Sequence, residues 1–364
     1  MRPLAKRQSA ATHAALSTAL LATTALAVAL PALAHHSRAN FDLGREIEVE
    51  GVVTEYAWKN PHAFVVVEST TEDGATVEWT FEMNSTPVLR RFGTTADSLA
   101  PGDHVIAHGN PDRDADKHFA YTTFFLKDDG TEVWSWGMPA DTDADTAPPA
   151  PAEVAGSSDF TGVWRIQFQP GFDVLGADQP DDVLVTDLPV NAAGQDLVDN
   201  FDPDMNPEWD CLPQSIPTLL GYPYPFEVSR GDDTLTFLYE VNHVERVIHL
   251  GATEVPADAE RSPVGYSIGR FDDDGALVIE TAHFAPVRWG LGEGVDSSEA
   301  KTTREVYRLV DDGMALEMDF VMEDPTYLAE PVERSFRYNL NAGYEIQDYF
   351  CDPETSRRHL TAGE

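Results

Sequence analysis

The amino-acid sequence predicts a nearly all-β protein with two folded domains. Most segments alternate apolar and polar residues with a period of two and are rich in β-branched and aromatic side chains, which is typical of half-buried strands. Gly, Asp and Pro residues separate these segments and mark turns. The chain of 364 residues is too long for one small domain.

Residues 1–34 have the three-part pattern of a secretory signal peptide. A basic start is followed by an uncharged apolar run from Ala14 to Ala34 that ends in the small-residue triplet Ala32-Leu33-Ala34. This pattern predicts cleavage after Ala34 and a periplasmic or secreted protein. A membrane anchor is the alternative interpretation, because the run is about long enough to cross a bilayer. Pro31 favours cleavage, and we expect no stable membrane anchor afterwards.

The charge balance and the cysteines restrict the function further. The chain carries 24 Lys and Arg against 63 Asp and Glu, for a net charge of −39. Such a surface repels phosphate backbones, so we expect no nucleic-acid partner. The cysteines are Cys211 and Cys351. An even number in an exported chain favours a disulfide between them, with two free thiols or a metal pair as the alternatives.

One stretch, residues 139–158, divides the exported part. It consists largely of Pro, Ala, Asp and Thr and has almost no large apolar residue, so it cannot bury enough surface to offset the entropy of ordering it. We therefore predict a disordered linker between a domain at residues 35–138 and a domain at residues 159–364.

Five strand-like segments and one helix are expected in the first domain. Thr86 can cap the helix, Pro87 suits its first position, and Gly93 can end it. The order of three strands, a helix and two strands is that of an OB-like five-stranded barrel, in which Gly51 suits a bend. The expected strands are 47–56, 63–68, 77–82, 102–109 and 119–126, and the expected helix is 86–93.

Residues 35–130 resemble a family of small exported bacterial proteins that is classed only as a domain of unknown function. Members of that family open with an HHS motif after the signal and carry an NPH motif. The resemblance implies export and brings no catalytic residues. The matching stretches in this chain are His35-His-Ser-x-x-x-Phe41-Asp42, Gly51-Val-Val, Asn60-Pro-His62-Ala-Phe and Gly102-Asp103.

The same histidines suggest a metal site that export would create. Cleavage after Ala34 would leave His35 as the first residue, with a free amine beside its ring. His36 or His62 could supply a further nitrogen, and imidazole and amine nitrogens favour Cu(II), with Zn and Ni less favoured. The alternative is that His35 and His36 form a solvated terminus and that His62 caps a turn.

The second domain is expected to form a lipocalin-like antiparallel barrel. It opens with Asp159-Phe-Thr-Gly-Val-Trp164, and a Gly-x-Trp on the first strand is how lipocalin-like barrels begin. A meander of later strands can close into a barrel and so hide its edges. The strand-like segments are 235–250, 266–271, 277–284, 303–309, 315–322 and 334–340.

This second part also resembles another group of exported bacterial proteins that has no assigned function. The resemblance is carried by Cys211-x-Pro213, Arg246-x-Ile-His249, Gly265-x-Ser267-x-Gly269, Glu280-Thr281 and Tyr349-Phe-Cys351. Gly265-x-Ser267-x-Gly269 has the letters of a nucleophile elbow, but the strand–turn–helix context that this motif needs is absent from the sequence pattern.

Polar residues in otherwise apolar strands are the candidates for a site in the second barrel. Glu240, Arg246, Ser267 and Glu280 could line a ligand cavity, and Glu240, Arg246 and His249 could form an acid–base set. The alternative is a Glu–Arg pair that satisfies itself in the core, because unpaired burial of such groups is costly.

We therefore expect an exported binding protein rather than an enzyme. The first barrel would bind a copper-like metal at His35, His36 and His62, and the second barrel would bind a small apolar ligand. The alternative function is a periplasmic isomerase or hydrolase that uses the acid–base set in the second barrel.

Overall fold

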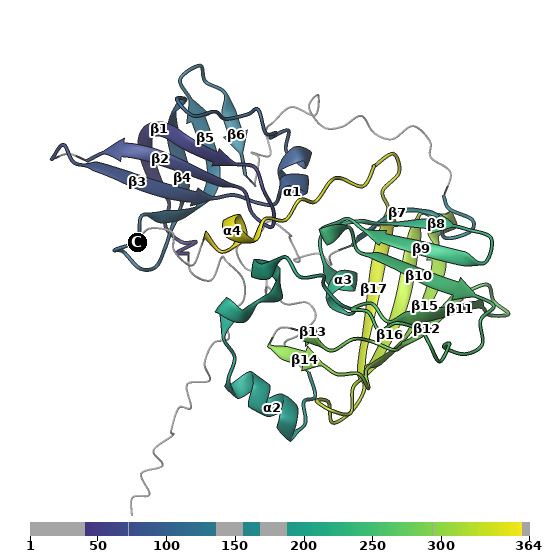
Figure 1. The fold of residues 1–364 in the computed structure, drawn as a ribbon. Coiled ribbons are helices and arrows are strands. Elements are labelled where there is room, and N and C mark those ends of the chain that lie inside the picture. Colours follow the sequence, from purple (N-terminus) through teal and green to yellow (C-terminus); the bar gives the residue numbers. More distant parts are fainter. Residues whose placement is uncertain (1–40, 72, 136–155, 168–187, 293, 359–364) are drawn as a thin grey trace, which may run out of the picture. The chain divides into compact units, whose positions relative to one another are not determined.

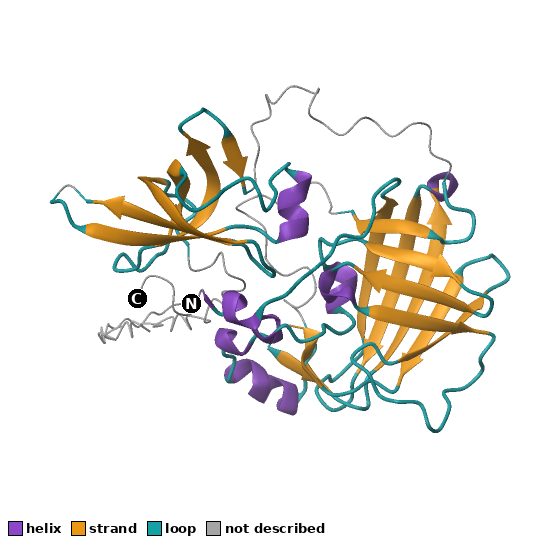
Figure 2. Cartoon of the chain, turned by 45° about the horizontal axis from the view of Figure 1, so that its top comes forward, coloured by secondary structure: helices purple, strands orange, loops and turns teal. Residues whose placement is uncertain are grey.

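The computed structural model describes residues 41–71, 73–135, 156–167, 188–292 and 294–358. Residues 35–364 group into one compact unit. The predicted signal peptide, the terminal His35 and His36, and most of the predicted linker lie outside the described residues. Two closed barrels dominate the described chain (Figure 2). Within the described part, no helix is both long and apolar enough to cross a membrane.

The first barrel has the strand order of an OB-like fold. Its sheet runs β3-β2-β1-β4-β5-β6, and a parallel pairing of β3 with β5 closes the first five strands into a barrel. This confirms the predicted architecture, and β6 is an additional strand. The elements are β1 (Ile47–Ala57), β2 (Phe64–Thr70), β3 (Thr76–Glu82), α1 (Thr86–Arg91), β4 (His104–Pro111), β5 (Phe119–Lys127) and β6 (Glu132–Trp134).

Strand β1 changes its pairing partner next to Gly51. Its first half pairs with β4 through Val52, and its second half pairs with β2 from Val52 onward. A Cβ atom at Gly51 would lie 2.3 Å from the carbonyl oxygen of Glu68. Only glycine therefore allows the two strands to approach so closely at this position.

The second barrel is a closed ring of nine strands, in the order β10-β11-β12-β15-β16-β17-β7-β8-β9 (Figure 1). Its core contains Trp164, Phe226, Phe237 and Tyr338. The strands are β7 (Gly162–Ile166), β8 (Phe226–Arg230), β9 (Thr234–Tyr239), β10 (Glu245–Leu250), β11 (Tyr266–Phe271), β12 (Leu277–Ala282), β15 (Thr302–Val310), β16 (Ala315–Glu323) and β17 (Val332–Leu340).

One pairing departs from the expected antiparallel meander. Strands β10 and β11 run parallel, with Ile248 opposite Ser267. The connection between them, residues 251–265, is long enough for the chain to return and start β11 in the same direction, whereas a tight hairpin would force an antiparallel pair.

The remaining elements lie outside the barrel strands. Helices α2 and α3 come between β7 and β8, and the hairpin of β13 and β14 comes between β12 and β15. These elements are α2 (Ala192–Asp199), α3 (Thr218–Gly221), β13 (Val287–Gly292), β14 (Val295–Ser297), α4 (Pro353–Ser356) and the 3₁₀ turns η2 (Pro203–Met205), η3 (Pro207–Asp210), η4 (Val241–His243) and η5 (Asp311–Gly313).

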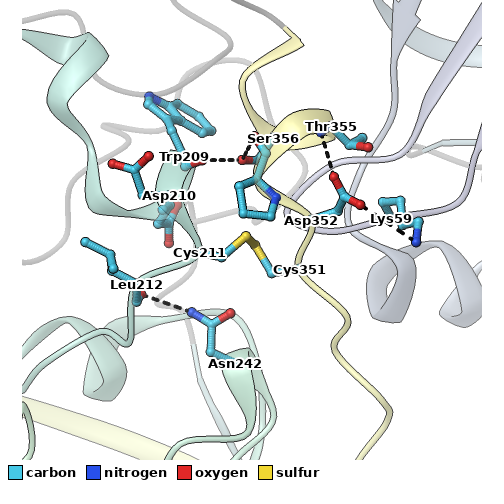
Figure 3. The surroundings of a disulfide bond; sticks show 12 residues. Lys59, Trp209, Asp210, Cys211, Leu212, Asn242, Cys351, Asp352, Thr355 and Ser356 are labelled. Carbon is cyan, nitrogen blue, oxygen red and sulfur yellow. Dashed lines mark hydrogen bonds and ion pairs between the residues drawn. A yellow bond between two sulfur atoms is a disulfide. The ribbon is translucent and has the colours of Figure 1, made fainter.

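The predicted disulfide between Cys211 and Cys351 is present, with a Cα–Cα distance of 5.7 Å. Figure 3 shows the C-terminal segment that it anchors. Next to the bridge, the amide of Asn60 donates to the carbonyl of Phe350, and the amide of Asp352 donates to the carbonyl of Asn60. The end of the chain therefore leaves the second barrel and contacts the turn after β1 in the first.

Candidate functional site

His62 lies in the turn between β1 and β2, and the preceding Asn60 holds this turn against the start of α1. The Asn60 side-chain oxygen accepts from the amide of Thr86 at 2.8 Å, and its nitrogen donates to the Thr86 hydroxyl at 3.0 Å. Asn60 is fully buried, so the turn is fixed by polar contacts that water does not weaken. These two hydrogen bonds of Asn60 also fix the backbone of the turn that carries His62.

The His62 ring is oriented through one of its two nitrogens. Nδ1 lies 2.8 Å from Oε1 of Glu82 and 3.0 Å from the carbonyl oxygen of Met83. Both partners are acceptors, so Nδ1 carries the proton. Among the described residues, Nε2 has no hydrogen-bonding partner. A carboxylate that holds one imidazole nitrogen in this way orients the other and makes it more basic.

Nearby negative charge changes the protonation of this histidine. Burial disfavours the charged imidazolium, but the carboxylate of Glu82, the charge of Glu208 and the Met83 carbonyl outweigh burial and raise the pKa of His62 above its ordinary value. The ring is therefore an unusually basic nitrogen donor in an acidic environment.

Three tyrosines from the second barrel's part of the chain lie near Glu208, and one of them contacts it. The hydroxyl of Tyr222 donates to the Glu208 carboxylate. The rings of Tyr222 and Tyr224 are 6.0 Å apart, and those of Tyr224 and Tyr349 are 5.5 Å apart. Burial raises the pKa of Tyr224 to about 12, and burial together with the Glu208 charge raises the pKa of Tyr222. These phenols therefore stay neutral donors at pH 7.

The described residues supply only part of the predicted metal site. They contain no group of three or more His, Cys, Asp and Glu side chains that could hold a metal ion. His62 is the one predicted ligand that the structure describes, since His35 and His36 lie outside the described residues. The predicted meeting of the three histidines stays a prediction.

A second polar group lies inside the nine-stranded barrel, around Arg246 of β10. Its guanidinium donates to Ser267 at 3.0 Å through Nε and to Thr281 at 2.8 Å through Nη2. It also makes a two-bond contact with Glu305, at 2.9 and 2.7 Å. The Tyr307 hydroxyl donates to the same carboxylate at 2.9 Å. Four strands, β10, β11, β12 and β15, are joined through this one group.

The electrostatics of this group favour a permanent ion pair. Burial alone would destabilise the charged guanidinium, but the Glu305 carboxylate outweighs burial and raises the pKa of Arg246. Both charged side chains are fully buried, and the hydrogen bonds engage both carboxylate oxygens and all three guanidinium nitrogens. The ion pair stiffens the barrel core, and the hydrogen-bond donors of Arg246 and the acceptors of Glu305 are used within this group.

The other predicted residues of the second barrel lie elsewhere. Glu240, just after β9, bonds to Arg91, Tyr344 and the amide of Gln347. His249 stacks on Tyr266 with ring centroids 4.3 Å apart. Glu280 is half exposed and pairs with Arg270 at 2.8 Å. Of the four predicted ligand-binding residues, the structure brings Arg246 and Ser267 together and places Glu240 and Glu280 in other groups.

The sequence pattern does not reveal Glu82, Glu305 and Lys301, which are among the buried charged residues. Glu82 ends β3, Glu305 lies in β15, and Lys301 immediately precedes β15. A signal for Glu305 exists, because Thr303, Glu305 and Tyr307 alternate with Arg304 and Arg308 and so share the inward face. Glu82 and Lys301 stand at strand ends, where alternation no longer separates buried from exposed positions.

Among curated proteins, no match to the chain is found. A protein-family model does match, over part of the first barrel and the segment before it, including the Asn60-Pro61-His62 turn. Residues 23–120 of this chain match a family described as a family of unknown function, DUF6152.

Proposed function

We propose that the chain is an exported metal-binding protein in which His62 presents Nε2 to a copper-like ion. The observation that carries the proposal is the pairing of His62 Nδ1 with Glu82 at 2.8 Å and with the Met83 carbonyl at 3.0 Å. Metal-bound histidines are held in this way, through the second ring nitrogen, by a carboxylate or a carbonyl.

The remaining ligands would come from the mature N-terminus. Cleavage after Ala34 would give His35 a free amine and place two imidazoles within two residues. Amine and imidazole nitrogens together favour Cu(II) over harder cations. Support comes from the motif letters around His35 and His62, and export to an oxidising compartment agrees with the Cys211–Cys351 disulfide.

The second barrel is proposed to serve mainly as a rigid support. The expectation that it holds a small apolar ligand stays a prediction, as does an acid–base reaction at Glu240, Arg246 and His249. What favours the supporting role is that Arg246 and Glu305 direct their hydrogen bonds to each other and to Ser267, Thr281 and Tyr307.

Titration of the mature protein with Cu(II), followed by electron paramagnetic resonance, tests the proposal. We expect nitrogen hyperfine splitting from imidazole that weakens in His62→Ala, and affinity on the order of 10- to 100-fold lower in Glu82→Gln. Adding one residue ahead of His35 removes the α-amine from the site and should also weaken binding. Unchanged spectra and affinity in all three variants would refute the proposal.

A further inference from the structure

The C-terminal segment, residues 350–358, lies on the turn that follows β1. The carbonyl of Phe350 accepts from the amide of Asn60 at 3.0 Å, and the amide of Asp352 donates to the carbonyl of Asn60 at 3.1 Å. Cys351, between these two residues, therefore forms a parallel bridge with Asn60. Both backbone polar groups of Asn60 are bonded to this segment.

The Cys211–Cys351 disulfide joins the C-terminal segment to the second barrel's part of the chain. Cys211 directly follows η3 (Pro207–Asp210), and the hydroxyl of Ser356 in α4 donates to the carbonyl of Trp209 in η3 (Figure 3). The covalent bond therefore lies within the stretch that contacts the turn, since Cys351 is itself the residue bridged to Asn60.

Two further contacts of the C-terminal segment with the first barrel are exposed ion pairs. Asp352 lies 3.9 Å from Lys59, whose side chain is 47% exposed, and Arg358 lies 2.7 Å from Glu55, whose side chain is also 47% exposed. Pairs of this kind stabilise little, because water and salt screen them. The disulfide, by contrast, is covalent and keeps the local concentration of the segment at Asn60 high.

Upstream of the disulfide, the chain is attached to the second barrel by contacts that involve no cysteine. The Tyr344 hydroxyl and the Gln347 amide donate to the buried carboxylate of Glu240, at 2.7 and 3.0 Å. The His243 ring lies 2.8 Å from the Gln347 carbonyl oxygen. Cleavage of the disulfide would therefore free the C-terminal segment and leave Tyr344 and Gln347 in place.

The disulfide is open to a reductant. Cys211 and Cys351 are only partly buried, and their neighbours Leu212 and Phe350 are 42% and 68% exposed. A dithiol can reduce such a bridge: its thiolate attacks one sulfur, a mixed disulfide forms, and its second thiol displaces the remaining cysteine. Two electrons and two protons pass to Cys211 and Cys351, and the dithiol becomes a disulfide.

We propose that the Cys211–Cys351 disulfide is a redox-sensitive latch, which holds the C-terminal segment on the turn Asn60-Pro61-His62 and releases it when a dithiol reduces the bridge. The released turn would keep the bonds between Asn60 and Thr86 but lose the contacts at both backbone groups of Asn60. His62 would then be less firmly oriented, and its affinity for a metal would fall. This last consequence rests on the proposed function, whereas the latch itself does not.

Amide hydrogen exchange of the metal-free protein, before and after addition of dithiothreitol, tests the latch. We expect the amides of Asn60 and Asp352 to exchange at least about tenfold faster after reduction, because both lose their acceptors. The control amides are those of Val65 in β2 and Ile279 in β12, which lie inside barrel strands and should stay protected. Unchanged exchange at Asn60 and Asp352 would overturn the latch, and so would equal acceleration at all four amides, which would mean that the bridge only stabilises the whole fold.

Titration with Cu(II) separates the latch from the proposed function. The double variant Cys211→Ser with Cys351→Ser stands in for the reduced state, because free thiols would themselves bind copper. We expect this variant to bind Cu(II) about 10-fold more weakly than the unmodified protein. Equal affinity would overturn the effect of the latch on His62. Absence of Cu(II) binding by both proteins would overturn the proposed function, and the exchange result would still decide the latch.

Discussion

Glu305 in β15 places both carboxylate oxygens on the guanidinium of Arg246 in β10, at 2.9 Å for Oε2 to Nη1 and 2.7 Å for Oε1 to Nη2. The two residues are 59 positions apart in sequence and come from strands that are not neighbours in the barrel. Their contact therefore spans β11 and β12, the two strands that lie between them in the ring.

Breaking this pair from one side should be strongly destabilising. Glu305→Gln leaves the buried Arg246 charge without its counter-ion, and we expect a loss of about 3–5 kcal/mol in the free energy of unfolding. The double variant Arg246→Met with Glu305→Leu should lose less than either single variant. Asp319→Asn, which breaks the exposed pair with Arg308, should cost only about 0–1 kcal/mol. Denaturant unfolding measures each variant, and an unchanged free energy of unfolding in Glu305→Gln would contradict the assignment.

Lys301 should give stability a distinct pH dependence. Its Nζ donates to Ser215 at 2.7 Å, to the Ile216 carbonyl at 2.8 Å and to the Gly290 carbonyl at 2.9 Å. Burial lowers its pKa from 10.5 to about 7, with a smaller effect from Arg246 and an opposing one from Asp324. Above pH 7 the unfolded chain therefore binds more protons at this residue than the folded chain does.

It follows that the contribution of Lys301 to the free energy of unfolding rises with pH between about 7 and 9. Relative to Lys301→Met, the unmodified protein should gain at most about 1.4 kcal/mol per pH unit over this range. Unfolding curves of both proteins at several pH values measure the difference. A constant difference across the range would show that Lys301 stays protonated in the folded state.

The Cys211–Cys351 bridge should stabilise the chain substantially. It closes a loop of sequence separation 140, for which the chain-entropy model gives roughly 4 to 5 kcal/mol. The double variant Cys211→Ala with Cys351→Ala should lose about this amount in guanidinium unfolding. Reducing agent should bring the unmodified protein to the same stability and leave the variant unaffected; an effect of the reducing agent on the variant would point to another cause.

Gly51 should tolerate no side chain. Gly51→Ala places a methyl group 2.3 Å from the Glu68 carbonyl oxygen, so the two strands must separate, and we expect a cost of about 1–3 kcal/mol. Gly44→Ala is the control, because its added methyl meets Asp42 at an ordinary 3.5 Å. Thermal unfolding that is equally affected by both substitutions would show that strand approach at Gly51 is not the cause.

Much of the fold could be predicted from the sequence because its strands alternate cleanly. Residues 266–271 were predicted as a strand and form β11 with the same bounds. The first barrel's order of elements was also predictable. Strands β6 and β14 are not predicted because three residues are too few for alternation to stand out, and β13 is not predicted because its buried and exposed positions do not alternate.

The contents of the candidate sites were much less predictable. The sequence pattern marks Arg246 as a polar residue in an apolar strand, but it indicates Glu240 and not Glu305 as its partner. The reason is that η4 interrupts the segment 235–250, which was expected to run as one strand. Asn242 has a left-handed backbone, with φ of 52°. This turn reverses the chain and sends Glu240 to a different set of neighbours.

The pairing of His62 with Glu82 illustrates a second limit. His62 lies in the turn before β2 and Glu82 ends β3, 20 positions away, and the antiparallel register of β2 and β3, with Phe64 opposite Glu82, brings them together. Sequence patterns locate strands but do not fix which end residues face one another across a turn. The NPH letters drew attention to His62 but gave no indication of its carboxylate partner.

Cu(II) titration of the mature protein and two histidine variants tests the central claim most directly. His62 is held by Glu82, whereas His249 stacks on Tyr266 and serves as the matched control. We expect the unmodified protein and His249→Ala to bind a single Cu(II) with the same affinity, and His62→Ala to bind at least tenfold more weakly. Equal Cu(II) affinity in His62→Ala and His249→Ala would contradict the proposed role of His62.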